Sequence, residues 1–201
     1  MIHLTKQQKA FYKMQKNRKG NFLVGGPLAS GKSMALHYCL LKEMTKFRWF
    51  CWFRKKSKTL LYCKNTALTT QSFLKHADMF GIKVSVIGYT VFYKDKPRIY
   101  IIDIPMCSRS LERDICVIDN INSTVEMQFR GMKAKKNLLS AYPEDKWFKS
   151  IPRTDLNLTE NPYLSPEYLN ALDDLPNKEI KKYIEGNWDY KDEIPTSLGD
   201  N

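Results

Sequence analysis

Long apolar runs are missing from this sequence. Apolar stretches such as Val117–Ile118 and Tyr100–Ile102 are far too short to cross a bilayer. The opening residues, Met1 to Gln8, contain no apolar segment of the kind that a secretory signal carries. We therefore expect a protein that neither spans a membrane nor is secreted.

Cysteine and histidine are also scarce. The five cysteines are odd in number and form no C-x-x-C pair, so we interpret them as reduced thiols of a cytosolic protein. The three histidines (His3, His37 and His76) lie far apart in the sequence, which argues against a zinc site. With 201 residues, of which 43% are hydrophobic and 27% charged, the chain is long enough to fold around one core without disulfides or a structural metal.

Acidic residues are nearly absent from the first third of the chain. Residues 1–64 contain 15 Lys and Arg against the single acid Glu43, whereas residues 65–201 contain 18 basic and 20 acidic residues. The net charge of the whole chain is +12. Such a basic front part indicates a polyanionic partner, most simply nucleic acid, and the alternative is an ordinary solvated basic surface.

Apolar runs and helical patterns alternate along the chain. The patterns predict strands at 21–24, 59–63, 84–86, 90–93, 98–104, 115–119 and 137–141. They predict helices at 4–16, 33–46, 70–80, 125–135, 165–175 and 177–183. Thr5 is the expected N-cap of the first helix, Gly81 ends the third, and residues 94–97 form a turn. This alternation indicates an α/β fold with a partly parallel sheet.

A glycine-rich motif follows the first predicted strand. Residues 26–33 read Gly-Pro-Leu-Ala-Ser-Gly-Lys-Ser, which fits the G-x-x-x-x-G-K-[ST] pattern of a phosphate-binding P-loop. Glycines let backbone N–H groups curve around phosphate oxygens, and the start of the next helix adds positive charge. The predicted nucleotide-binding residues are Gly26, Ser30, Gly31, Lys32 and Ser33. Lys32 would bind the β- and γ-phosphates and Ser33 would hold Mg²⁺; the alternative is a glycine-rich turn with an incidental lysine.

An aspartate ends the apolar run 115–118. A P-loop site needs a carboxylate at the end of a buried strand to help hold the metal, and Asp119 fits that position; the alternative is an ordinary turn or helix-capping residue. The next residue is Asn120, where many translocating ATPases carry a glutamate that activates water. Because asparagine is no base, we expect slow hydrolysis or an acid from elsewhere. Glu126 is the nearest candidate in sequence, and its alternative is a plain helix residue.

Several segments form a recognisable set. They are Leu4–Phe11 with Gln8, Gly25–Ser33, Asp119, Leu139-Ser140-Ala141-Tyr142-Pro143 with Lys146-Trp147, and the stretch from Thr159-Glu160-Asn161-Pro162-Tyr163-Leu164 to Glu185-Gly186-Asn187-Trp188. Together they resemble the ATPase domain of the large terminase subunit, the DNA-packaging motor of tailed bacteriophages. The P-loop is specific only to P-loop proteins, whereas the last stretch points to the family itself.

The resemblance implies a P-loop NTPase fold of the ASCE type over residues 1–188, with a closing helical segment at about 159–188 and a polar tail at 189–201. It implies ATP and Mg²⁺ as cofactors, with Lys32 and Asp119 in catalysis and Ser33 and Asp119 on the metal. By the same resemblance Gln8 reads adenine, and Ser140 lies in the segment that couples the phosphate state to domain motion.

The family also suggests partners. They are double-stranded DNA bound without sequence preference, a portal protein, a small terminase subunit and further copies in a ring, all in the cytoplasm of the host cell. Only the tail 189–201 follows Trp188, so we expect the family's RNase H-like nuclease domain to be missing and a separate chain to supply it. The sequence does not decide which residue is the arginine finger: the alternatives are Arg109, Arg113, Arg130 and an arginine of a neighbouring subunit.

Two further features have two interpretations each. The aromatic and basic strip at 47–58 suits stacking on bases and pairing with phosphates, but more simply ends a helix against the core. Lys64 is either a basic residue facing the nucleotide or an ordinary lysine at a strand end. The alternative functions are a hydrolysis-poor nucleotide-binding regulator, motivated by Asn120, and another P-loop enzyme such as a helicase-like ATPase or a small kinase.

Overall fold

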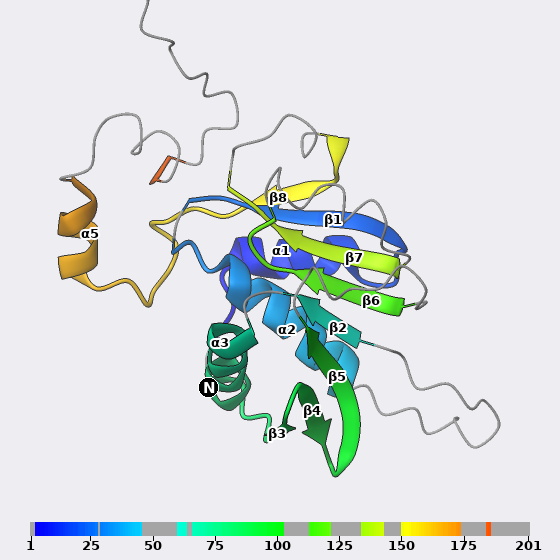
Figure 1. The fold of residues 1–201 in the computed structure, drawn as a ribbon. Coiled ribbons are helices and arrows are strands. Elements are labelled where there is room, and N and C mark those ends of the chain that lie inside the picture. The colour runs from blue at the N-terminus through cyan, green and yellow to red at the C-terminus, as the bar shows by residue number, and fades with distance from the viewer. Residues whose placement is uncertain are drawn as a thin grey trace, which may run out of the picture.

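A mixed sheet covered by a layer of helices forms the body of the protein, seen here in a computed structural model (Figure 1). The structure describes residues 3–27, 29–45, 60–63, 66–102, 113–121, 134–142, 150–173 and 184–185. Within these residues the sheet has eight strands.

The order of the strands places the carboxyl ends of the central ones side by side. Across the sheet the strands are β3 (Ser85–Ile87), β4 (Thr90–Tyr93), β5 (Lys96–Ile102), β2 (Leu60–Cys63), β6 (Arg113–Ile118), β7 (Ala134–Ser140), β1 (Gly20–Gly25) and β8 (Arg153–Asp155). All neighbouring strands from β5 to β8 pair in parallel, whereas β3 and β4 form an antiparallel hairpin at one edge. Strand β7 lies between β1 and β6, which is the arrangement of the ASCE type.

Three helices form one layer along the sheet. Helix α1 (Lys6–Gln15) packs against β8, α2 (Lys32–Thr45) packs against β1 and β7, and α3 (Thr66–Met79) packs against β5. Since α2 also contacts both α1 and α3, the helices follow the same order as the strands beneath them. A further helix, α5 (Pro166–Asp173), lies to one side of this layer in Figure 1.

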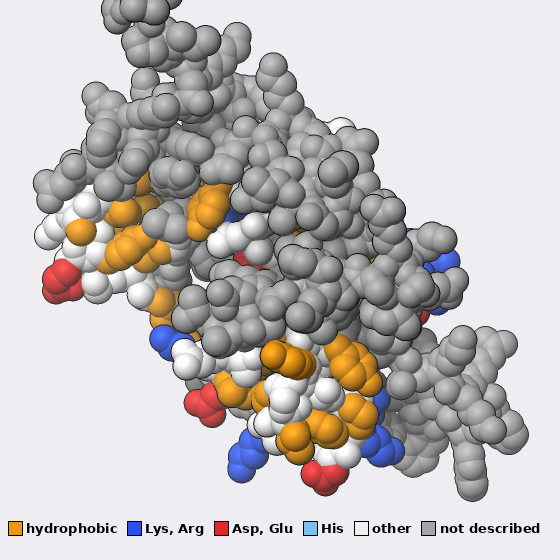
Figure 2. Space-filling view, in the orientation of Figure 1, with side chains coloured by type: hydrophobic (Ala, Val, Ile, Leu, Met, Phe, Trp, Pro, Cys, Tyr) orange, Lys and Arg blue, Asp and Glu red, His pale blue; other side chains and the backbone are white. Residues whose placement is uncertain are grey.

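The core lies between this helical layer and the sheet. Phe11, Leu36, Leu40 and Phe73 from the helices meet apolar strand residues such as Leu138, and all five are fully buried. Strand β6 is apolar along residues 115–118 because both faces of a central parallel strand are covered. On the hairpin edge, by contrast, Ile87, Tyr89 and Tyr100 are exposed. Figure 2 shows hydrophobic side chains gathered on this part of the surface.

Most predicted elements are present in the described residues. Thr5 caps α1 in a capping box with Gln8, since each side chain accepts a hydrogen bond from the other residue's backbone N–H. Gly81 follows α3 with a φ of +69°, and its N–H donates to the Asp78 carbonyl. The predicted fold class, an α/β P-loop NTPase with a mostly parallel sheet, is confirmed.

Several boundaries were predicted wrongly. Helix α3 begins at Thr66 rather than at residue 70. The turn expected at 94–97 is limited to Lys94 and Asp95, whose φ angles of 51° and 59° close a tight hairpin, so residues 96 and 97 already belong to β5. Ala134 and Lys135 belong to β7 rather than to a helix.

The closing part of the chain differs most. Strand β8 was not predicted from the sequence. It has only three residues, Arg153–Asp155, and these show no alternation of apolar and polar side chains. The segment expected to be helical from about 159 onwards runs as turns until α5 begins at Pro166. The helix predicted at 177–183 lies outside the described residues, as does most of that predicted at 125–135. Nowhere in the described part of the chain is there a helix with the length and apolar character to cross a membrane.

Candidate nucleotide-binding site

Parallel pairing brings the ends of β1, β6 and β7 to one edge of the sheet. Val24 of β1 lies opposite Ser140 of β7, and Ile118 of β6 lies opposite Leu139. Asp119 therefore leaves β6 beside the end of β7, next to the loop that follows β1. Open parallel sheets bind their ligands outside the carboxyl ends of their strands, so this edge is the place to look for a site.

The motif lies between β1 and the start of α2, as predicted: residues 26, 27 and 29–31 are described in the loop, and Lys32 and Ser33 are the first two residues of α2. Gly26 has a φ of +129°, and a Cβ there would lie 2.5 Å from the Leu156 carbonyl oxygen. Gly31 has a φ of +87°, and a Cβ there would lie 2.6 Å from Nε2 of Gln8. Both positions therefore need glycine for the backbone angle, and Gly26 needs it also for the space beside the Leu156 backbone.

Lys32 is folded back over this loop. Its Nζ donates to the carbonyl oxygens of Gly26 at 2.8 Å and Pro27 at 2.5 Å, and lies 4.1 Å from the centre of the Tyr142 ring. The Ser30 hydroxyl donates to the same Pro27 carbonyl at 2.9 Å. The cation is thus fixed at the centre of the loop by oxygen acceptors and an aromatic face.

Ser33 and Asp119 meet although they are far apart in the sequence. The Ser33 hydroxyl donates to one oxygen of the Asp119 carboxylate at 2.6 Å, and the Ser140 hydroxyl donates to the other oxygen. The Ser140 Oγ also accepts the backbone N–H of Asn120 at 2.8 Å. The ends of β6, β7 and the first turn of α2 are therefore joined through one buried carboxylate.

Burial makes the charged form of two basic side chains unfavourable here. It lowers the pKa of Lys32 from 10.5 to about 7, while the Asp119 carboxylate acts in the opposite direction. It lowers the pKa of His76 from 6.5 to about 4, with a further decrease from Lys75 and an opposing effect of Asp119. An anion that entered the site would stabilise the protonated form of Lys32.

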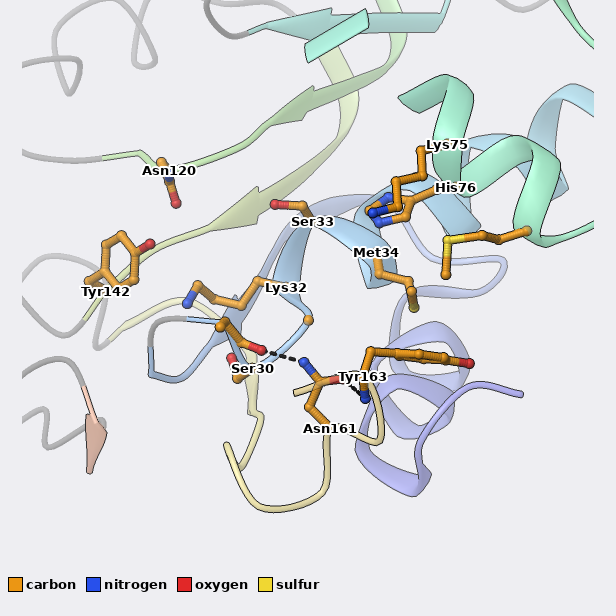
Figure 3. Close-up of a pocket in the computed structure, with 13 residues that line it drawn as sticks. Ser30, Lys32, Ser33, Met34, Lys75, His76, Asn120, Tyr142, Asn161 and Tyr163 are labelled. Carbon is orange, nitrogen blue, oxygen red and sulfur yellow. Dashed lines mark hydrogen bonds between the residues drawn. The ribbon is translucent and has the colours of Figure 1, made fainter. Parts of the chain in front are cut away.

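A pocket of about 590 Å³ opens beside these residues (Figure 3). This volume is in the range of small-molecule sites. Its walls come from residues 29–34 of the loop and α2, from Lys75, His76 and Met79 of α3, and from Asn120, Tyr142, Asn161 and Tyr163. Figure 3 shows Lys32, Tyr142 and Asn120 toward one end and Met34, Tyr163, Lys75 and His76 toward the other.

Helix α3 contributes residues that the sequence analysis missed. The Nδ1 atoms of His37 and His76 lie 2.5 Å apart, so the pair joins α2 to α3, and His76 also lines the pocket. Their spacing of 39 positions gave no signal in the sequence. Tyr142 was noticed only as part of the segment around Ser140, although its ring is the partner of the Lys32 ammonium.

Gln8 lies behind the loop rather than in the pocket. Its side chain is 3% exposed, its Oε1 accepts the Thr5 N–H at 3.0 Å, and its Nε2 donates to the Gly31 carbonyl at 3.2 Å. In this structure both polar ends of the amide are therefore used to hold α1 against the loop. The adenine-reading role expected from the resemblance stays a prediction.

Other candidates lie outside the described residues. These are Lys64, Arg109, Glu126, Arg130 and the strip 47–58. Arg113 is the first residue of β6, at the opposite end of that strand from Asp119.

The strand order and the loop between β1 and α2 define the class of this protein: it has a P-loop NTPase fold of the ASCE type. More particularly, its fold is similar to that of large terminase ATPase domains, which confirms the resemblance at the level of the fold. The large terminase of a thermophilic bacteriophage, solved in complex with ADP, matches with a TM-score of 0.63 and 14% identity over 92% of this chain and 54% of that one. This chain therefore spans about half the length of that terminase.

Two further structures carry the same fold. The ATPase domain of the Thermus phage P74-26 large terminase matches with a TM-score of 0.55 and 13% identity over 94% of both chains. A chain of the bacteriophage Phi-29 viral genome packaging motor assembly matches with a TM-score of 0.50 and 15% identity, over 73% of this chain and 50% of that one. No protein-family model and no curated protein matches the sequence.

Proposed function

We propose that this chain is the ATP-hydrolysing domain of a viral DNA-packaging motor and that it couples hydrolysis to translocation of double-stranded DNA. The contact between Ser33 and Asp119, 2.6 Å long and adjacent to the buried Lys32, is the observation that carries this proposal. It joins a hydroxyl, a carboxylate and a cation at the mouth of a glycine loop, which is the set that phosphoryl transfer requires. The likeness to terminase ATPase domains supports the coupling to DNA.

Each group has a role in this proposal. Gly26, Ser30 and Gly31 shape the loop around the phosphates, and Lys32 neutralises charge that develops on the transferring phosphoryl group. Gln8 holds the loop from behind through the Gly31 carbonyl, in addition to any contact with the base.

The residues at the carboxyl edge suit Mg²⁺. Ser33 and Asp119 offer hard oxygen donors, and Mg²⁺ is ordinarily held by one or two such side chains together with substrate phosphates. Among the described residues, no group of three or more His, Cys, Asp and Glu side chains is placed to hold a metal ion. When bound, the metal would neutralise charge on the phosphates.

The partners are proposed on separate grounds. Residues 6–19 carry six basic residues and no acidic one, which supports binding to the DNA backbone by charge. Assembly into a ring with a portal protein and a small terminase subunit, in the host cytoplasm, is supported by the likeness to the Phi-29 motor assembly.

The proposal is tested by steady-state ATP hydrolysis with and without double-stranded DNA. We expect turnover that rises with DNA, that loses its DNA dependence as salt increases, and that falls about a hundredfold or more in Lys32→Ala. Lys83→Ala, which removes an exposed lysine beyond α3, is the matched control and should match wild type. Turnover no higher than that of Lys32→Ala, with or without DNA, would contradict the motor.

Asn120 favours a second candidate, a nucleotide-binding regulator with little turnover. This residue lines the pocket at the position after Asp119, and its amide cannot act as a general base that activates water. The regulator predicts that wild type binds ATP tightly, with a Kd far below that of Lys32→Ala, while the two proteins release phosphate equally slowly. Binding and turnover measured on the same samples therefore separate the two functions.

A further inference from the structure

The end of the pocket away from Lys32 carries an aromatic side chain without a role in phosphate binding. Tyr163 is 48% exposed and lines the pocket together with Met34 and Met79. In the proposed function, Lys32 and Ser33 fix the phosphates at their end of the pocket. The base of a nucleotide is flat and less polar than its phosphates, so it belongs against the ring of Tyr163 and the two methionines at the second end, which Lys75 and His76 also border.

Tyr163 is held in place by its backbone. The Asn161 side chain donates through Nδ2 to the Ala29 carbonyl of the loop at 2.5 Å and accepts the Tyr163 N–H through Oδ1 at 3.2 Å. One amide thus links the glycine loop to the residue that carries the aromatic ring, as Figure 3 shows.

A second set of contacts ties the same segment to α1. Gln7 donates through Nε2 to Glu160 at 2.9 Å and accepts the Asn157 N–H through Oε1 at 3.0 Å. The segment 157–163 is therefore held both by the loop itself, through Ala29, and by α1, through Gln7. A half-exposed ring on a backbone held in this way suits ligand stacking, because little further ordering of the backbone is needed when the ligand arrives.

We propose that Tyr163 is the stacking platform for the nucleobase, and that Asn161 is the positioning residue that sets this platform relative to the phosphate loop. This inference rests on the proposed function, since it assigns the base subsite of the same nucleotide pocket. Met34 and Met79 provide soft, polarisable walls that adapt to a flat ring. Stacking favours the larger π-surface of a purine over that of a pyrimidine.

The test compares two ligands, ATP and inorganic tripolyphosphate, by isothermal titration calorimetry with Mg²⁺ present. Tripolyphosphate has the phosphates but no base. Tyr163→Ala should weaken ATP binding about tenfold, leave tripolyphosphate binding unchanged and remove the preference for ATP over CTP. Tyr163→Phe should bind ATP like wild type. Tyr89→Ala, which removes another exposed tyrosine, should change neither affinity.

A double mutant tests the positioning role of Asn161. As a single substitution, Asn161→Ala should weaken ATP binding. In a Tyr163→Ala background it should have little further effect if the amide acts through the ring. Equal ATP affinity of Tyr163→Ala and wild type, with tripolyphosphate still bound by both, would overturn the platform and leave the proposed function intact. Failure of wild type to bind either ligand would instead overturn the proposed function and this inference with it.

Discussion

Acidification should weaken the packing of α2 against α3 through the histidine pair. His37 is fully buried, and its Nδ1 lies 2.5 Å from Nδ1 of His76, so one nitrogen must donate a proton and the other must accept it. Protonating the accepting nitrogen would set two donors against each other. Burial and the nearby Lys75 lower the pKa of His76 to about 4, whereas Asp119 opposes the shift.

The sign and size of the effect follow from this pKa. Because the pKa of His76 is lower in the folded state than its ordinary value of 6.5, the unfolded chain binds more protons between pH 6.5 and 4. Stability contributed by the neutral imidazole is therefore present above pH 6.5 and is lost as the pH falls toward 4. With these pKa values, lowering the pH from 7 to 5 costs about 2 kcal/mol, a sizeable part of the ~5–15 kcal/mol that stabilises a typical domain.

Urea unfolding at pH 7, 6 and 5 measures this loss, with His76→Leu as the comparison. Carboxylates far from His76 titrate equally in both proteins, so the difference in the pH dependence reports on the histidine pair and its immediate surroundings. The wild type should lose about 2 kcal/mol more than the variant between pH 7 and 5. Parallel curves for the two proteins, or an NMR titration that places the pKa of His76 near 6.5, would refute the reasoning.

Two substitutions at the loop and the carboxylate give further expectations. Gly31→Ala should lower the free energy of unfolding by about 1–3 kcal/mol, because φ is +87° and the new Cβ would meet the Gln8 amide; an unchanged denaturation midpoint would contradict this. Ser140→Ala should leave the protein folded but reduce ATP turnover about tenfold or more, because Asp119 and the Asn120 N–H lose a shared partner; wild-type turnover would show that this link is not needed.

The glycine loop and its surroundings could be predicted because their signals are local. The motif 26–33, the strand before it and the helix after it are contiguous, and the motif assigns each of its positions an expected role in phosphate binding. Asp119 could also be predicted, since an apolar run that ends in a carboxylate is typical of a buried parallel strand. Its contact with Ser33, 86 positions away, then follows from the order of the strands.

The remaining walls of the pocket could not be predicted, for physical reasons. Lys75, His76 and Met79 face the site only because α3 crosses beside α2, and nothing in their own sequence differs from an ordinary helix surface. Gln8 was expected in the pocket from its position in a motif, yet its burial depends on how closely α1 approaches Gly31. Such distances are set by packing between elements and cannot be derived from the spacing of residues along the sequence.

Asn120 shows how a conformational requirement can determine the residue that follows the end of a strand. Its φ is +57°, in the left-handed region that asparagine tolerates better than most residues, and its N–H donates to Ser140. A glutamate there would incur a backbone cost of about 1–2 kcal/mol before it could orient a water molecule. The sharp turn after β6 thus favours an asparagine for structural reasons. An acid for water activation, if the motor is active, would then have to come from another segment or from a neighbouring subunit.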